Sequence, residues 1–369
     1  MKTMTPIGWP EIEKCLRLKK PIHERDLSGL DARGRALRGA VFNRCRLAGA
    51  RFEGCDLRRA KFIECELAGV DLGQAALEQN TFVKCDMRRM RFPAKAREAD
   101  VLEYLHCVES ALCGSAWTGS HLRLCTFTRC DLSGAALGLA RLERVVLTQC
   151  TLDQADLSCI TLDQAVMYEA DLRTVKLDGL KADTAVMMNA DLRGKPLAGA
   201  QLVRCMLQDA DFGGADLTGA NLTGSNCHKA RFTGTRMAKL QAQRSLFLAA
   251  VFEQADLSGA DLEGAVFQQA SARNTRFDGA NLTKTVWDKS RHAGVSFAGA
   301  DMRYSRFDHA RGIGIDFDRA RLDSSRFHDA VLQDATYRGA SRSRLQGTDA
   351  ALLAAEARTL STEQATEET

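Results

Sequence analysis

The residues whose chemistry would first suggest a site are two histidines near the end of the chain. His309 and His328 each lie beside an aspartate, Asp308 and Asp329 respectively. Imidazole and carboxylate are both donors that zinc accepts in proteins. Two histidines without a third ligand, and without groups that orient them, nevertheless make a weak site. We therefore predict no metal-binding residue from this pattern.

Motifs for nucleotides and for catalysis are equally sparse. Gly312 and Gly314 form a Gly-x-Gly pair, but the strand before it and the helix after it that a dinucleotide fingerprint requires are not indicated. The other histidines are scattered along the chain. Catalysis needs groups that converge in a concavity. We predict no catalytic residue, no cofactor-binding residue and no cofactor, and we interpret the chain as non-enzymatic.

What the sequence does contain is a five-residue register. All sixteen phenylalanines, from Phe42 to Phe327, stand at positions whose number leaves remainder two when divided by five. We call this position the centre of each five-residue unit. The residue two positions before the centre is small, and polar residues alternate with the small residue and the centre. Such alternation is typical of a strand, with the small residue and the centre on one side. Because five matches neither the strand period nor the helix period, the chain must turn after every unit, and we expect repeat architecture from Leu37 to Tyr337.

The spacing of the aromatic residues predicts the number of sides in each coil. Aromatic centres recur every twenty residues, which is the pattern expected if like residues stack on like in successive coils. Twenty residues then form one coil with four sides. Three such series are Phe42, Phe62 and Phe82; Phe247, Phe267, Trp287, Phe307 and Phe327; and Phe277, Phe297, Phe317 and Tyr337.

The repeated unit, A-(D/N)-L-x-x in many variants, resembles the pentapeptide-repeat family along about nine-tenths of the chain. Clear copies are Ala215-Asp216-Leu217, Ala260-Asp261-Leu262 and Ala280-Asn281-Leu282. The resemblance implies an all-β solenoid of the right-handed quadrilateral β-helix type, with about fifteen coils at about twenty residues per coil. It also implies that the centre and the small residue fill the interior and that the other three positions face solvent.

Three segments are expected on this basis. Residues 1–26 precede the clean register and contain a short helix with Pro10 in its first turn. Residues 27–340 form the β-helix. Residues 341–369 contain a second helix, from Asp349 to Leu360, and a polar, acidic tail that we expect to be disordered. Because an uncapped coil exposes strand edges, we expect both helices to cap the solenoid.

One interruption of the register is evident. Lys95 falls on a small-residue position and Arg97 on a centre, and neither cation belongs in an apolar interior. We therefore expect the wall to open over residues 93–106. Two interpretations stay open: a surface insertion that the solenoid tolerates, and a loop that contacts a partner through Lys95, Arg97 and Tyr104.

The thirteen cysteines are best explained by packing. Eight occupy the small-residue position and two occupy a centre, so they substitute for buried apolar residues. Cysteines one coil apart would be separated by roughly 4.8 Å, which exceeds the Cβ separation of about 3.8 Å in a disulfide. The chain has no CxxC metal motif.

The charge of the chain limits which partners are plausible. The net charge is +4 at neutral pH. Family members of the quinolone-resistance type imitate duplex DNA with an acidic surface that occupies the DNA site of gyrase, and a cationic surface cannot imitate phosphates. Columns such as Arg44, Glu64 and Lys84 alternate in sign, so neighbouring coils neutralise one another. We expect no nucleic-acid partner, because outer aromatic residues that would stack on bases are missing.

One side breaks the polar pattern. The residue just before the centre is polar on most sides, whereas on one side it is apolar at nearly every twentieth position from residue 146 onward. Contiguous exposed apolar strips mark partner surfaces, so we predict a protein-binding face here. The alternative is that β-branched residues simply suit a parallel ladder. The predicted face comprises Val146, Val166, Tyr168, Val186, Met188, Met206, Leu246 and Leu248, and Val266 and Val286 continue the same column.

Our leading hypothesis is a rigid protein-binding scaffold or adaptor that docks a partner protein, of unknown identity, on this apolar face. A fixed row of side chains loses little conformational entropy on binding. Segments such as Phe42–Leu47 and Phe82–Met87 resemble, more narrowly, the bacterial pentapeptide proteins that accompany type VI secretion. The alternatives are a topoisomerase-directed DNA mimic and a purely structural spacer. We expect no small-molecule substrate, and either a monomer or an end-to-end homodimer.

The same sequence predicts the location. No stretch of about eighteen apolar residues occurs, and the first residues show no basic flank followed by an apolar run. We therefore expect neither a membrane span nor a secretion signal, and a cytoplasmic location.

Overall fold

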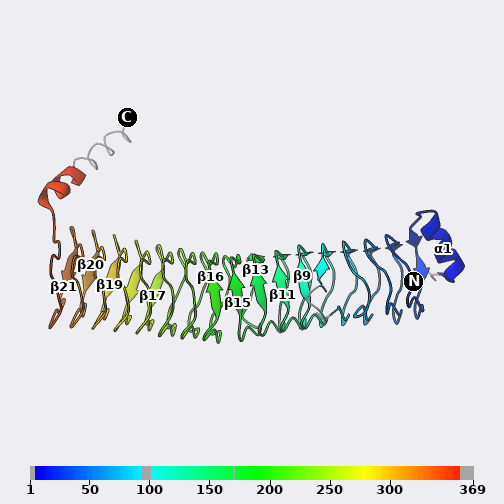
Figure 1. Ribbon diagram of the computed structural model, residues 1–369, viewed down its shortest axis with the longest axis horizontal. Helices are drawn as coiled ribbons and strands as arrows, with labels where there is room; N and C mark the ends of the chain where they lie inside the picture. The colour runs from blue at the N-terminus through cyan, green and yellow to red at the C-terminus, as the bar shows by residue number, and fades with distance from the viewer. Residues whose placement is uncertain (1–4, 94–100, 169–170, 358–369) are drawn as a thin grey trace. The chain divides into compact units, whose positions relative to one another are not determined.

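The computed structural model describes residues 5–93, 101–168 and 171–357, and its architecture is a parallel β-solenoid. The chain divides into two compact units. The first comprises Met1–Leu192 and Ala200–Met206, and the second comprises Arg193–Gly199 and Leu207–Thr369. In each unit successive coils stack on one another (Figure 1), and the chain contains about sixteen turns in all. The predicted all-β solenoid is confirmed.

The first unit contains two larger parallel sheets, each forming one side of its coils. The sheet of eight strands has the order β14-β12-β10-β8-β6-β5-β4-β2, and the sheet of six has the order β16-β15-β13-β11-β9-β7. The strands of the eight-stranded sheet are β2 (Ile22–His23), β4 (Val41–Asn43), β5 (Lys61–Ile63), β6 (Thr81–Val83), β8 (His106–Val108), β10 (Thr126–Thr128), β12 (Val146–Thr148) and β14 (Val166–Tyr168). Those of the six-stranded sheet are β7 (Leu102–Glu103), β9 (His121–Arg123), β11 (Arg141–Glu143), β13 (Thr161–Asp163), β15 (Lys181–Asp183) and β16 (Gln201–Val203). A small sheet pairs β1 (Thr5–Pro6) with β3 (Arg25–Asp26).

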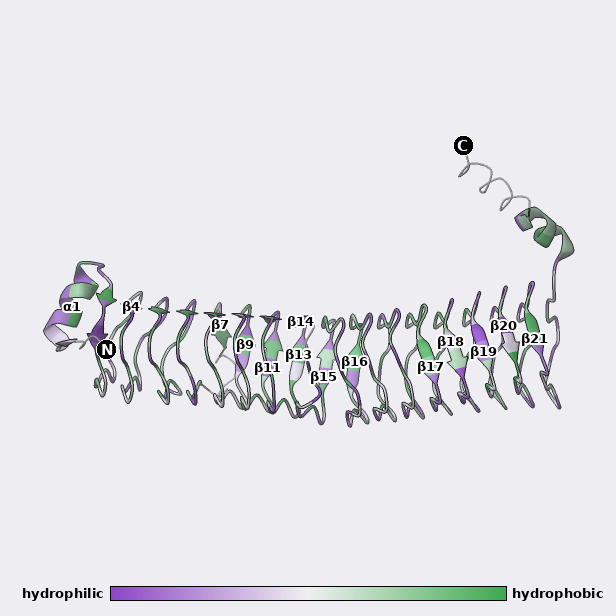
Figure 2. Ribbon diagram, turned by 180° about the vertical axis from the view of Figure 1, so that it is seen from behind, coloured by the Kyte–Doolittle hydropathy of each residue, from purple (hydrophilic) through white to green (hydrophobic). Residues whose placement is uncertain are grey.

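The second unit contains one five-stranded parallel sheet, and its strands follow one another in chain order. Figure 2 shows β17 and β21 as hydrophobic strands and β19 as a hydrophilic one. The strands are β17 (Val251–Glu253), β18 (Ser271–Arg273), β19 (Arg291–Ala293), β20 (Arg311–Ile313) and β21 (Val331–Gln333).

The register explains why each coil has four sides. Strand partners are twenty residues apart, as Val41 and Lys61 are. Every described residue with a positive φ has a number ending in 4 or 9, so a left-handed corner recurs every five residues. Glycine fits such a corner without a steric cost, as Gly54 does at φ 71°, but Arg44 adopts a φ of 53° in the same role. Four corners in every twenty residues confirm the predicted four-sided coil.

The interior is filled by the centre residues. Phe42, Phe62 and Phe82 stack with their ring centroids 4.9 Å apart in each step, close to the separation of neighbouring strands. All three rings are at most 1% exposed. The same stacking continues in the second unit, where Phe267 and Trp287 lie 3.9 Å apart.

At the interruption one coil contains twenty-five residues instead of twenty. Thr81 pairs with His106, and Phe92 stacks on Trp117. Lys95 and Arg97 lie outside the described residues. Leu102 is 6% exposed and pairs with Leu122, so the predicted opening over 93–106 does not include residues 102–106. The extra five residues in this spacing keep the interior positions on either side in the same register.

Two short helices flank the coils. Helix α1 (Trp9–Arg17) has Pro10 in its first turn, and its Ile12 is fully buried. The indole Nε1 of Trp9 donates a hydrogen bond to the carbonyl of Asp31 at 3.0 Å, which joins the helix to the first coils. The second helix covers residues 350–357, and the carboxylate of Asp349 accepts hydrogen bonds from the first helical amides. In the part of the chain that the structure describes, neither helix has the length and apolar character needed to cross a bilayer.

Candidate protein-binding face

In the first unit the structure places four predicted face residues in one column. Val146 pairs with Val166, Val166 with Val186, and Val186 with Met206. The backbone amides of Val166, Val186 and Met206 each donate to the preceding coil at 2.8 Å. Because each residue is held by its neighbours in the ladder, the side chains form a fixed row about 15 Å long at about 4.8 Å per coil.

The exposure of these side chains differs along the column. Met206 is 40% exposed, whereas Val146, Val166 and Val186 are half-buried. The valines are shielded because each stacks between neighbours in the ladder, and part of each residue still faces solvent. Tyr168, at the other end of strand β14, is 43% exposed and pairs with Thr148, and Met188 is half-buried. We call the row Val146, Val166, Val186 and Met206 the apolar column of the first unit.

Polar corner residues border the apolar column. The guanidinium of Arg144 donates from Nε to the side-chain oxygen of Gln164 at 3.0 Å. In the following coils Arg204 donates to the carboxylate of Asp183 at 2.6 Å. An apolar centre with a polar rim is the usual composition of a protein interface.

The interior behind the column is apolar and carries no ionised cysteine. The small-residue positions there are Val145, Ala165, Ala185 and Cys205, all at most 1% exposed. Burial raises the pKa of the Cys205 thiol to about 12, so the thiol is neutral at physiological pH. The face therefore rests on a tightly packed layer.

The second unit carries a shorter apolar row. Leu246 pairs with Val266, and Val266 with Val286, while Asn226 and Arg306 occupy the positions at either end. Leu246 is 38% exposed, and Val266, Val286 and the adjacent Leu248 are half-buried. Three apolar residues between two polar ones present less surface than the column of the first unit.

Of the predicted contact loop, only Tyr104 is among the described residues. It is 38% exposed and forms a corner with φ 52°. Its amide bonds to the carbonyl of Arg123, and in the next coils the amides of Leu124 and Arg144 make the equivalent bonds. Tyr104 therefore belongs to the corner row that borders the apolar column, and its expected place in a loop outside the wall is wrong.

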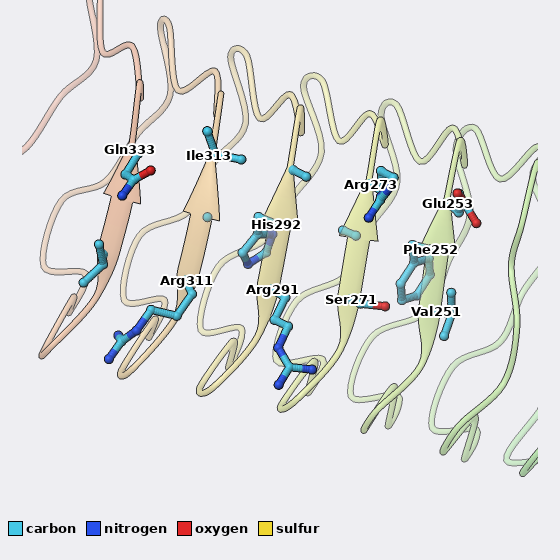
Figure 3. A pocket seen from close by; sticks show the side chains of 14 residues that line it. Val251, Phe252, Glu253, Ser271, Arg273, Arg291, His292, Arg311, Ile313 and Gln333 are labelled. Carbon is cyan, nitrogen blue, oxygen red and sulfur yellow. The ribbon is translucent and has the colours of Figure 1, made fainter.

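The sequence pattern also did not single out a groove of about 700 Å³ on the outer side of the five-stranded sheet. Figure 3 shows Arg291 and Arg311 extending from the same ends of β19 and β20. Ile313 and Val331 add apolar surface at 49% and 46% exposure. Gly312 is among the residues that line the groove, and in the sequence it stood out only as part of a Gly-x-Gly pair.

The groove offers basic and apolar surface. The His292 side chain that lines it does not act there as an acid or a base. The hydroxyl of Ser290 donates to the carbonyl of Trp287, so it accepts from Nε2 of His292 at 2.8 Å. Burial lowers the pKa of His292 to about 4, which keeps the imidazole neutral. His292 is therefore a packed interior residue.

Comparison with known families identifies the repeat. The pattern described as pentapeptide repeats matches eight copies, in residues 26–62, 106–144, 140–179, 200–237 and 247–285, which together make up about half of the chain. The chain belongs to the pentapeptide-repeat family. Members of this family form right-handed quadrilateral β-helices, in agreement with the predicted fold class. A comparison with curated proteins gives no match.

Solved structures that match part of this chain include other pentapeptide repeat proteins. HetL, a protein of Nostoc sp. strain PCC 7120 involved in heterocyst differentiation regulation, is 23% identical over 61% of this chain and 87% of its own, with a TM-score of 0.27. QnrB1, a plasmid-mediated fluoroquinolone resistance protein, is 17% identical over 70% of this chain and 97% of its own, with a TM-score of 0.28. A protein of the Arabidopsis thaliana thylakoid lumen is 28% identical over 26% of this chain and 66% of its own, with a TM-score of 0.25. At such TM-scores these likenesses carry no argument about function.

Proposed function

We propose that this protein is a non-enzymatic scaffold that binds a partner protein on the apolar column of the first unit. The observation that carries the proposal is that Val146, Val166, Val186 and Met206 are successive lateral partners on an outer side. Their row ends in the exposed thioether of Met206, and a polar rim runs beside it. A flat, fixed row of this kind suits a partner with a flat or extended apolar surface.

Ladder formation alone does not account for the apolar residues. The equivalent position in β13, β15 and β16 is occupied by Thr161, Lys181 and Gln201, and these residues pair in the same way. Polar residues thus form the parallel ladder on another side of the same unit. Strand propensity therefore does not explain why the residues at this position are apolar on one side only, and a role in binding is favoured.

The surface charges argue against DNA mimicry as the function. Acidic residues are paired with basic ones in the adjacent coil: Arg44 contacts Glu64 at 2.7 Å, and Arg236 contacts Asp216 at 3.0 Å. With a net charge of +4 the chain offers no excess of negative charge that would imitate phosphates. The topoisomerase-directed mimic and the structural spacer are kept as outcomes of the test below.

We also propose a cytoplasmic location. All thirteen cysteines are free thiols, and nine of them are at most 2% exposed in the interior. Free thiols persist in reducing compartments. A link to type VI secretion stays a prediction from the sequence, because none of the relatives named above bears on it.

The test uses a variant that replaces two apolar residues without leaving an unpaired charge. Val166→Asp with Val186→Arg copies the native pair of Asp216 and Arg236 onto the apolar column. Thr161→Asp with Lys181→Arg introduces the same two residues on a polar side and is the matched control. Each protein is used for affinity purification from a bacterial lysate, followed by mass spectrometry.

The proposal expects a partner retained by the wild type and by the control but lost from the column variant. Identical protein lists from all three would contradict it and favour the spacer. Topoisomerase subunits held equally by all three would favour the mimic.

A further inference from the structure

A group of potential metal ligands lies in the last coils of the second unit. His309 and His328 lie in adjacent coils with their rings edge to face, and the amide of His309 is bonded to the carbonyl of His328 at 2.8 Å. Glu356 comes from the helix at residues 350–357. One ligand atom from each of the three residues lies within 4.8 Å of the other two. The third ligand that the sequence pattern lacked is thus supplied by the C-terminal helix.

The hydrogen bonds of His309 direct a free lone pair toward Glu356. The Nδ1 of His309 lies 3.1 Å from a carboxylate oxygen of Asp329, so Nδ1 carries the proton and donates it. The other ring nitrogen, Nε2, then presents its lone pair to a carboxylate oxygen of Glu356 at 3.4 Å. In this neutral tautomer two acceptors face each other, whereas a second proton on the ring would make Nε2 a donor to Glu356. A cation between them would turn this repulsion into attraction.

The support for His309 resembles that of a metal-binding histidine. A carboxylate that accepts the distal N–H fixes the ring orientation and makes the ligand nitrogen more basic. Arg311 in turn holds Asp329 through a contact of 2.7 Å. The Nε2 atom is therefore positioned before any ion arrives.

His328 is the third potential ligand, and its side chain is buried. It is 1% exposed, and its Nε2 lies 3.3 Å from the same oxygen of Glu356. Its Nδ1 accepts a hydrogen bond from the amide of Asp349 at 3.1 Å, so in the absence of an ion the proton is on Nε2. If Nε2 of His328 binds a metal ion, this proton moves to Nδ1. The hydrogen bond from the amide of Asp349 to Nδ1 is then lost, and a metal–nitrogen bond at Nε2 is gained.

The local charge suits a divalent ion. Four carboxylates and two guanidinium groups surround the imidazoles, which leaves a net charge of −2 when both imidazoles are neutral. Arg306, which also reaches Asp308, is balanced by Asp288. The six groups are Asp308, Asp329, Asp349, Glu356, Arg311 and Arg326.

We propose that Nε2 of His309, Nε2 of His328 and the carboxylate of Glu356 bind one divalent transition metal of the zinc class. Two imidazoles and one carboxylate are a ligand set that zinc uses with water at the fourth position. Imidazole ligands favour zinc, copper or nickel over magnesium and calcium. The bound ion would fasten the C-terminal helix to the last coils, because two ligands come from the coils and one from the helix.

The experiment measures zinc and cobalt binding to the full chain after treatment with a chelator. Isothermal titration with Zn²⁺ gives the stoichiometry and affinity, and Co²⁺ reports the geometry through its visible absorption. Thiolate ligation of Co²⁺ produces a near-ultraviolet charge-transfer band, which distinguishes the proposed ligands from cysteines. Hydrogen exchange at residues 350–357 reports whether the ion fastens the helix.

Three variants identify the ligands. His309→Ala removes a coil ligand, and Glu356→Gln removes the helix ligand at a side chain that is 35% exposed. Glu143→Gln is the matched control, because His121 and Glu143 also lie 3.1 Å apart but form no described three-ligand group.

We expect one Zn²⁺ per wild-type chain, no such binding in His309→Ala, an affinity lower by at least about tenfold in Glu356→Gln, and no change in Glu143→Gln. We also expect slower hydrogen exchange in the C-terminal helix of the wild type with Zn²⁺ than without it. Absence of binding by the wild type, equal binding by His309→Ala, or a thiolate band would each overturn the proposal.

Discussion

The indole of Trp117 stacks on the ring of Phe92 with their centroids 3.5 Å apart and their planes 10° apart, although twenty-five positions separate them in the sequence. Equivalent interior rings such as Phe42 and Phe62 are twenty positions apart. The pair therefore closes the interior across the coil that contains the additional unit. Ser115 accepts the indole N–H of Trp117 at 2.6 Å, so the ring is anchored as well as stacked.

Truncating Trp117 should destabilise the first unit strongly. Trp117 is fully buried, and loss of a large buried aromatic side chain costs about 3–5 kcal/mol. Urea unfolding of Trp117→Ala, followed by circular dichroism, measures the loss in free energy of unfolding. Tyr304→Ala is the control, because Tyr304 is 62% exposed and should change stability by less than about 0.5 kcal/mol. Equal stability of both variants would show that the stacked pair does not support the enlarged coil.

The charge pattern on the apolar column should decide whether its variants fold well. Val166 and Val186 are direct lateral partners, so Val166→Asp with Val186→Asp stacks two like charges. We expect a lower melting temperature for this variant than for Val166→Asp with Val186→Arg, by an amount equivalent to roughly 1 kcal/mol. Differential scanning calorimetry measures both. If the opposite-charge variant melts as low as the like-charge one, burial of the two valines dominates, and loss of partner binding would need a milder variant such as Val166→Thr.

The buried imidazole of His292 should make stability depend on pH. Its pKa in the folded protein is about 4, below the ordinary value of 6.5, because burial disfavours the charged ring. Its contribution is therefore fully present above about pH 6.5 and is lost as the pH falls toward 4, a loss of about 3 kcal/mol. Guanidinium unfolding at several pH values should show a smaller decline over this range for His292→Leu than for the wild type. Parallel declines would mean that the ring becomes charged in the folded state without penalty.

The thiols should react in an order set by exposure. Cys159 is an exposed thiol, whereas burial raises the pKa of Cys125 to about 12 and that of Cys113 to about 11. A raised pKa lowers the fraction of reactive thiolate. Titration of the native protein with a disulfide reagent should show one fast thiol, and Cys159→Ser should lack that phase. Persistence of the fast phase in this variant would show that another cysteine becomes accessible.

The repeat pattern predicted the architecture well because each five-residue unit adopts the same local geometry. Residues whose number leaves remainder two when divided by five were predicted to be interior. Phe42 and Phe317, which are far apart in the sequence, are both fully buried. The count of twenty also placed Val146, Val166 and Val186 in one column, since no insertion falls between them. Whether this column binds a partner is not decided by its position in the coil.

Other features depend on contacts that the repeat does not encode. The step from Gln79 to Tyr104 in one corner row spans twenty-five residues, because Glu78 pairs with Glu103, and a count of twenty does not supply it. Glu356 belongs to a helix outside the register, so its approach to His309 follows from how that helix packs. Gly312 is required because a Cβ there would lie 2.5 Å from the Cδ1 of Ile315 and 3.1 Å from the Cβ of His292, and only the folded coils show this crowding.

The spacing of twenty-five residues also indicates how the outer surfaces of such proteins can diverge. Gain of one five-residue unit leaves every buried position in phase, yet it moves each later outer residue to the neighbouring side relative to the residues before the gain. Val41, Lys61 and Thr81 thus share a column with His106 rather than with residue 101. A single small insertion or deletion can therefore present a different set of side chains to the outside while the interior is inherited unchanged.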